Sequence, residues 1–206
     1  MSGDVTIIEN IDITSEDVGT KLASALAGIT IDVLVNNAGS YNATRELEGM
    51  AGFQEQALTS IPISRMMAAF DLNTLGVLRI VQAVLPFLNK EKSKICVLST
   101  GMGSIADNTS GGSYAYRCSK AATNMMCKGM SVDLLKQNVA VVAVNPGMVA
   151  TDFGPGKEAM AKMGGMPVSQ SCSGLVQIFD ELSLENTGRF MSVHKEQGPM
   201  EYAKGW

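Results

Sequence analysis

The stretch IDVLVNNAG, residues 31–39, has the composition of a strand that is buried on both faces, and it ends in polar residues and a glycine. Near-continuous apolar runs of this kind are typical of parallel sheets, because helices cover both faces of such sheets. On either side of it along the chain, apolar runs alternate with segments whose apolar residues recur at helical spacing. This alternation predicts an α/β fold with a doubly wound parallel sheet.

The expected elements follow one another without a linker-like segment or an internal repeat. Strands are expected at 5–13, 31–39, 93–101, 138–147 and 188–193, and helices at 14–28, 65–89, 113–137 and 169–183. The helix at 14–28 opens with Thr14 and Asp17, a pair that predicts a capping box. Residues 1–206 are therefore expected to form a single domain.

Composition narrows the classes of function. A formal net charge of −4 without a basic run argues against nucleic-acid binding. Four cysteines, Cys96, Cys118, Cys127 and Cys172, form no CxxC pair and do not group with the single histidine, His194, which predicts free thiols in a reducing compartment and no metal site. The N-terminus has no signal-peptide pattern and no apolar run is as long as a membrane span, so we expect a cytoplasmic protein without a membrane partner.

The residue types that carry chemistry stand at the ends of the expected strands and on one helix. In a doubly wound sheet, sites lie at the carboxyl ends of the strands. Tyr116 and Lys120 are four positions apart, so a helix places both side chains on one face. Asn73 lies in the middle of a helix, where its propensity is poor. Each feature has an ordinary structural explanation when taken singly, whereas their order and placement together predict a site.

The ordered set NNAG, LNTLG, LST, YAYRCSK and NPGMVATD resembles the motifs of the short-chain dehydrogenase/reductases. The stretch GSIADNTSGGSYAYRCSKAATNMM and the tail TGRFMSVHKEQGPMEY are similar to the sniffer and C-factor-like carbonyl reductases. The resemblance extends over the chain from residue 5 onward. It implies a Rossmann-like fold and reduction of an aldehyde or ketone with NADP as cofactor, NAD being the alternative. It further implies a small carbonyl substrate and a homodimer or homotetramer.

The resemblance implies a catalytic role for Asn73, Thr100, Tyr116 and Lys120. A phenol with a pKa near 10 exchanges protons poorly at neutral pH until a nearby positive charge favours the phenolate. Lys120 would supply that charge and hold the cofactor ribose, while Tyr116 donates a proton to the substrate carbonyl. Asn73 would hold a water near Lys120 through its backbone carbonyl.

Thr100 stands where the family usually has a serine. Threonine keeps the hydroxyl but adds a methyl group and a stiffer side chain, so the pocket is narrower at that point. Ser99 and Ser104 are the alternative donors. Cys118, two positions after Tyr116, points off the face of the pair and is expected to pack against the rest of the fold.

The resemblance also implies cofactor contacts along the strand ends. Pro146 and Gly147 would shape the backbone beside the nicotinamide ring, and Val149 and Thr151 would hold its carboxamide. Asp12 matches the aspartate that the family has near the adenine of the cofactor. An ordinary turn residue at the end of a strand is an equally good interpretation of Asp12. The full set of implied cofactor residues is Asp12, Asn36, Ala38, Gly39, Tyr116, Lys120, Pro146, Gly147, Val149 and Thr151.

The chain departs from the family at its beginning, because residues 1–30 contain no glycine-rich turn of the form TGxxxGxG. Such a turn receives the pyrophosphate at a helix N-terminus. The chain is therefore expected to be N-terminally truncated relative to the family, without its first βαβ unit, and to bind dinucleotide more weakly. A family remnant that acts in regulation or interaction is the alternative function. The strand at 5–13 is expected to pair with 31–37, unless another subunit covers that edge.

Two further segments leave alternatives open. The excess length at 45–64 is interpreted as a surface insertion rather than as a substrate-covering element. The methionine-rich segment 148–166 is either a mobile lid or a plain loop, and its glycines permit movement.

Overall fold

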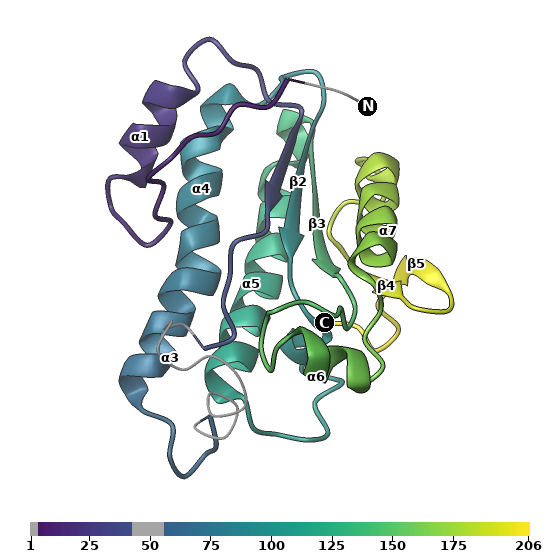
Figure 1. The fold of residues 1–206 in the computed structure, drawn as a ribbon. Coiled ribbons are helices and arrows are strands. Elements are labelled where there is room, and N and C mark those ends of the chain that lie inside the picture. Colours follow the sequence, from purple (N-terminus) through teal and green to yellow (C-terminus); the bar gives the residue numbers. More distant parts are fainter. Residues whose placement is uncertain (1–3, 43–55) are drawn as a thin grey trace.

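The computed structural model describes residues 4–42 and 56–206 and contains a five-stranded sheet in the order β1-β2-β3-β4-β5 (Figure 1). The first four strands are parallel, and β5 pairs antiparallel with β4. The strands are β1 (Val33–Asn36), β2 (Ser93–Leu98), β3 (Val139–Asn145), β4 (Arg189–His194) and β5 (Gly198–Glu201). The predicted α/β fold with a Rossmann-like parallel sheet is confirmed.

Helices lie on both sides of the sheet, with α1, α4 and α5 on one side and α7 on the other (Figure 1). The helices are α1 (Val18–Ala25), α3 (Ile63–Phe70), α4 (Gly76–Val84), α5 (Tyr114–Asp133), α6 (Lys157–Lys162) and α7 (Val168–Glu181). A π-helical turn, Asp71–Leu75, joins α3 to α4. The helix expected at 65–89 is therefore one uninterrupted helical run.

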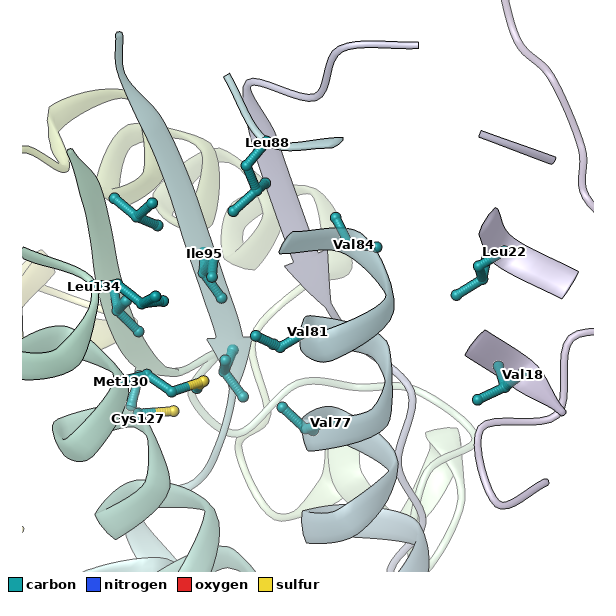
Figure 2. Packing of buried hydrophobic residues seen from close by; sticks show 14 of the residues in the cluster. Val18, Leu22, Val77, Val81, Val84, Leu88, Ile95, Cys127, Met130 and Leu134 are labelled. Atoms are coloured by element: carbon teal, nitrogen blue, oxygen red, sulfur yellow. The ribbon is translucent and has the colours of Figure 1, made fainter. Parts of the chain in front are cut away.

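The core follows from the alternation of side chains along the central strands. Ile95 of β2 is fully buried on the side of α4 and α5, where it packs with Val81 and Met130 (Figure 2). Cys96, the next residue, faces the other way and packs in a second cluster with Ile178 of α7. Because successive residues of a strand point to opposite faces, a continuous apolar run fills both layers.

The helical run 63–87 is, within residues 4–42 and 56–206, the one segment long and apolar enough to cross a membrane by length and composition. Val77, Val81 and Val84 of this run are buried in the main core beside the sheet (Figure 2). Packing against the sheet accounts for the apolar residues of α4, whereas Ile63 and Met67 of α3 are exposed.

The strand predicted at 5–13 is absent from the structure, and the predicted pairing with 31–37 is wrong. Residues 5–13 form no ladder, and β1 is the outer strand of the sheet. Asn10 adopts a left-handed conformation with φ of 60°, which interrupts the extended run. Val5 is 85% exposed, so the apolar start of the segment finds no partner among the described residues. Cover of β1 by another subunit stays a prediction.

Local details at three other places differ from the expectations. No capping box forms, because the hydroxyl of Thr14 donates to Asp12 and Asp17 accepts no capping hydrogen bond. The short elements α6 and β5 were not expected. Both lie in segments rich in glycine, where sequence patterns predict turns.

Candidate active site

The strand register brings three polar strand ends to the same edge of the sheet. Asn36 of β1 lies opposite Val97, and Leu98 of β2 lies opposite Val144. The segments that follow these strands, NNAG, STG and NPG, therefore start at neighbouring positions. Helix α5 packs against the loop after β2 through Gly103, where an added Cβ would lie 2.9 Å from the backbone carbonyl carbon of Lys120. Only glycine allows that approach of loop and helix.

Lys120 is 4% exposed and lies in the first half of α5. Its ammonium Nζ donates to the backbone oxygen of Leu98 at 2.8 Å. Burial lowers the pKa of Lys120 to about 8 from its ordinary 10.5. An ammonium has three donors, so the bond to Leu98 leaves two of them for a bound molecule.

Tyr116 lies on the same face of α5 and is 6% exposed. Two aromatic rings pack against it, with centroid separations of 4.9 Å for Tyr41 and 5.9 Å for Phe153. Burial raises the pKa of the Tyr116 phenol above its ordinary value, and a hydrogen bond with the Thr100 side chain acts in the opposite direction. The structure thus places Tyr116 and Lys120 on one buried face of α5, with the half-buried Thr100 beside Tyr116.

The electrostatic expectation for Tyr116 is not met in this arrangement. The four-residue spacing predicted that the ammonium of Lys120 would lower the pKa of Tyr116, whereas burial dominates and raises it. Lys120 directs its ammonium to Leu98 instead of to the phenol. The packing of Tyr41 and Phe153 against the phenol removes water from it, and this loss of solvation favours the neutral form.

Of the hydroxyl residues that follow β2, Thr100 is the one whose side chain lies beside Tyr116. Its Oγ1 also accepts the backbone N–H of Met102 at 3.2 Å, which fixes the start of the following loop. The hydroxyl of Ser99, the first alternative donor, donates a hydrogen bond to Oδ1 of Asn124. Ser104, the second, accepts the backbone N–H of Asp107. Both serines are engaged in structural bonds.

Asn73 is fully buried in the π-helical turn. Its side-chain Oδ1 accepts the backbone N–H of Ser40, and its Nδ2 donates to Ser40 O and to the hydroxyl of Ser119. Its backbone oxygen accepts the hydroxyl of Thr123 at 2.9 Å. Asn73 therefore joins the loop after β1 to the helix that carries Tyr116. The water proposed at its backbone carbonyl stays a prediction.

The residues implied for the adenosine side lie in two places. Asn36 is buried at the end of β1, and its Nδ2 has no hydrogen-bond partner among the described residues. Ala38 and Gly39 follow it on the exposed side, and a Cβ at Gly39 would lie 3.5 Å from Lys120 Nζ. Asp12 stands apart in an exposed turn, where its carboxylate accepts the N–H and the hydroxyl of Thr14. The turn interpretation of Asp12 therefore has direct structural support.

The segment after β3 is bent sharply and held by α7. Pro146 O accepts the hydroxyl of Ser171, and Gly147 has a φ of +82°, which favours glycine. Val149 forms an isolated bridge with Met166, and the N–H of Thr151 donates back to Val149 O. This bridge closes the segment 148–166 at its base, with α6 inside it.

The sequence patterns did not indicate Tyr41, Gln56 and Phe153, which contact Tyr116, or Ser113, which bonds to Tyr41. They come from loops, so no periodicity marks them, although Tyr41 stands only two positions after Gly39.

Cys118 is exposed on α5, so the expectation that it packs within the fold is wrong. The insertion expected at 45–64 lies largely outside the described residues, which resume at Gln56. Within the described ranges, no group of three or more His, Cys, Asp or Glu could hold a metal ion.

Comparison with known proteins assigns the family. A model of the family described as short chain dehydrogenase matches residues 1–162. The chain belongs to the short-chain dehydrogenase family. This short-chain dehydrogenase is 35% identical over 188 residues to 1-hydroxy-2-glutathionyl-2-methyl-3-butene dehydrogenase of Rhodococcus sp. (strain AD45), covering 90% of the chain and 76% of the relative. It is 36% identical over 170 residues to the C-signal protein of Myxococcus xanthus, covering 82% of the chain and 92% of that relative.

Solved structures of the same family are similar in fold. The NADPH-bound carbonyl reductase from chicken fatty liver is 27% identical with a TM-score of 0.72, over 88% of this chain and 72% of that one. The carbonyl reductase Sniffer of D. melanogaster is 30% identical with a TM-score of 0.72, over 88% of this short-chain dehydrogenase and 73% of that chain. Relatives named C-signal and Sniffer confirm the resemblance predicted from the motifs.

Proposed function

We propose that this short-chain dehydrogenase reduces an aldehyde or a ketone with a nicotinamide cofactor. The observation that carries the proposal is the buried pair Tyr116 and Lys120, with the partly buried Thr100 beside Tyr116, at the carboxyl edge of the sheet. The likeness to two carbonyl reductases supports the substrate class. The cofactor, when bound in reduced form, supplies the hydride.

The residues of the chain handle the proton and the orientation of the substrate. Tyr116 donates its phenolic proton to the substrate carbonyl oxygen as that oxygen gains negative charge. The Thr100 hydroxyl, whose interaction with the phenol acts to lower the pKa of Tyr116, orients the proton and the carbonyl oxygen. Lys120 uses its two remaining ammonium donors on ribose hydroxyls. Asn73 holds the loop of Ser40 against α5 and thereby keeps these groups in register.

The residues around Lys120 fit the nicotinamide–ribose half of such a cofactor. The absence of a side chain at Gly39 leaves room beside Lys120 Nζ, and the buried Nδ2 of Asn36 offers an unused donor. Ala38, Pro146, Gly147, Val149 and Thr151 line the same strand ends. Residues 4–42 contain no glycine-rich turn that leads into a helix. These residues therefore offer a pyrophosphate group fewer backbone N–H donors than such a turn would. NADP is favoured because the chicken relative binds NADPH, and NAD is the alternative.

Titration with NADPH and NADH, followed by nicotinamide fluorescence, tests the cofactor. We expect saturable binding in the micromolar range. Lys120→Met should weaken it about tenfold or more, because a charge-assisted hydrogen bond is lost. Lys128→Met, a change on the outer part of the same helix, serves as the matched control and should bind normally. Absence of binding at millimolar NADPH would refute the proposal.

The alternative function is a family member that regulates or interacts without turnover. The observation that favours it is the closed environment of Tyr116, which is 6% exposed beneath Tyr41 and Phe153. A chain without detectable NADPH binding but with a stable fold would support this alternative.

We infer further that the protein is a cytoplasmic homodimer or homotetramer. Apolar side chains are exposed on two helices, with Met67 of α3 69% exposed and Met125 and Val132 of α5 73% and 65% exposed. Such exposed apolar surface is typical of subunit interfaces. Met125→Glu should shift the mass measured by light scattering toward the monomer, and an unchanged mass would place the interface elsewhere. Cell fractionation tests the location.

A further inference from the structure

Helix α5 begins without a cap of its own. Its N-cap residue, Ser113, has a left-handed backbone with φ of 50° and ψ of 38°, and its side chain makes no capping hydrogen bond. The first N–H groups of a helix have no partner within the helix and need an acceptor from elsewhere. Tyr116, the third residue of α5, carries one of these N–H groups. Its acceptor therefore bears on how the phenol is held.

Gln56 supplies that acceptor from a distant loop. Its Oε1 accepts the backbone N–H of Tyr116 at 3.1 Å, and its own backbone oxygen accepts the N–H of Tyr114. Its Nε2 donates to the backbone oxygen of Tyr41 at 2.9 Å. The residue is fully buried, so both ends of its amide are used away from water.

The hydroxyl of Ser113 is used for a second link in the same place. It forms a hydrogen bond with the phenol of Tyr41 at 2.5 Å. The ring of Tyr41 packs in turn on the ring of Tyr116 at 4.9 Å. Gln56 and Ser113 thus fix Tyr41 at its backbone and at its hydroxyl, while Gln56 also holds the backbone of Tyr116.

We propose that Gln56 is a positioning residue for the proton donor Tyr116, a role that rests on the proposed function. It caps the first turn of α5 from outside and ties that turn to Tyr41. The position requires one donor and one acceptor on the same side chain. Glutamine meets this requirement, whereas a carboxylate cannot donate to Tyr41 O and methionine does neither.

Amide hydrogen exchange, resolved by residue, tests the proposal without any need for turnover. In the unaltered chain the amide of Tyr116 should exchange more slowly than that of Ala115 in the same turn. Gln56→Met keeps the length of the side chain and should speed exchange at Tyr116 about tenfold or more. Gln82→Met, at an exposed glutamine of α4, is the matched control and should leave Tyr116 unchanged.

Gln56→Glu supplies a rescue that a general loss of stability would not show. When its carboxyl group is protonated it again has one donor and one acceptor. The side chain of Gln56→Glu still accepts the Tyr116 N–H in either protonation state, so Tyr116 should stay protected where Gln56→Met loses protection, and most completely at low pH, where the protonated group also donates to Tyr41 O. Tyr116 protection as low in Gln56→Glu at low pH as in Gln56→Met overturns the proposal, and so does unchanged Tyr116 protection in Gln56→Met.

Turnover, where it occurs, supplies a separate outcome. Gln56→Met should lower kcat about tenfold and leave KM for NADPH unchanged, because Gln56 is proposed to act through Tyr116 and not on the cofactor. A rise in KM alone would contradict the role. If the unaltered chain shows no turnover, the proposed function fails while the exchange measurements still decide whether Gln56 positions Tyr116.

Discussion

The side-chain amide of Asn73 donates to the hydroxyl of Ser119, 3.0 Å away, and so joins the π-helical turn to the helix of Tyr116. The same amide pairs in both directions with the backbone of Ser40. Three hydrogen bonds would be lost if the amide were removed. The bond to Ser119 lies where water cannot replace it, because Asn73 is fully buried and Ser119 is 1% exposed, whereas the two bonds to Ser40 are partly buried.

Asn73→Leu, which keeps the size of the side chain, should therefore lower the free energy of unfolding by about 2–4 kcal/mol. Chemical denaturation followed by circular dichroism measures the change. Gln82→Leu, at an exposed amide of the same helical run, is the control and should change stability by less than about 0.5 kcal/mol. Equal effects of the two substitutions would show that the Asn73 bonds contribute nothing specific.

The lowered pKa of Lys120 predicts a pH dependence of stability. Between the folded pKa of about 8 and the ordinary 10.5, the unfolded chain binds a proton that the folded chain has released. The contribution of this group to the free energy of unfolding therefore rises with pH across that window, by up to about 3 kcal/mol.

Other buried groups act in the opposite direction at high pH. Burial raises the pKa of Cys96 and of Cys127 to about 12, so their contribution is complete below 9.0 and is lost above it. Both cysteines are present in Lys120→Met as well, so the difference in free energy of unfolding between the unaltered chain and this variant leaves out the cysteine contribution. Between pH 8 and 9 the unaltered chain should gain about 1 kcal/mol relative to Lys120→Met. Parallel stability curves would contradict the assigned pKa.

Phe153 packs on the ring of Tyr116 from the segment 148–166 and is itself 43% exposed. Phe153→Ala should open the phenol to solvent and reagents. Nitration of Tyr116 by tetranitromethane, located by mass spectrometry, should then become about tenfold faster or more, in line with a lower pKa of the more solvated phenol. Met163→Ala, at an exposed side chain of the same segment, should leave the rate unchanged. Rapid nitration of Tyr116 in the unaltered chain would show that Phe153 is no cover.

The central strands and the helix of Tyr116 could be predicted because their patterns are local. The run from Val139 to Val144 is apolar throughout, and only a strand covered on both faces suits it. The run 5–13 looked similar, but it does not pair with β1, the outer strand of the sheet, and Asn10 interrupts its extended backbone. Strand pairing is a property of two segments and is not contained in either one.

The site shows the same division between local and tertiary information. The four-residue spacing of Tyr116 and Lys120 was enough to place both on one buried face. The sign of the pKa shift of Tyr116 was not predictable, because it depends on Tyr41 and Phe153, which reach the phenol from two separate loops. Gln56 escaped notice for that reason as well, since its bond to Tyr116 spans 60 positions of the chain.

The most direct test of the account is NADPH oxidation in the presence of a panel of aldehydes and ketones, followed by the loss of NADPH absorbance. The unaltered chain should turn over at least one carbonyl compound, and Tyr116→Phe should reduce kcat about a hundredfold or more, the usual contribution of a positioned proton donor. Tyr114→Phe, two positions away on the same helix, should keep normal activity. Full activity of Tyr116→Phe would contradict the account.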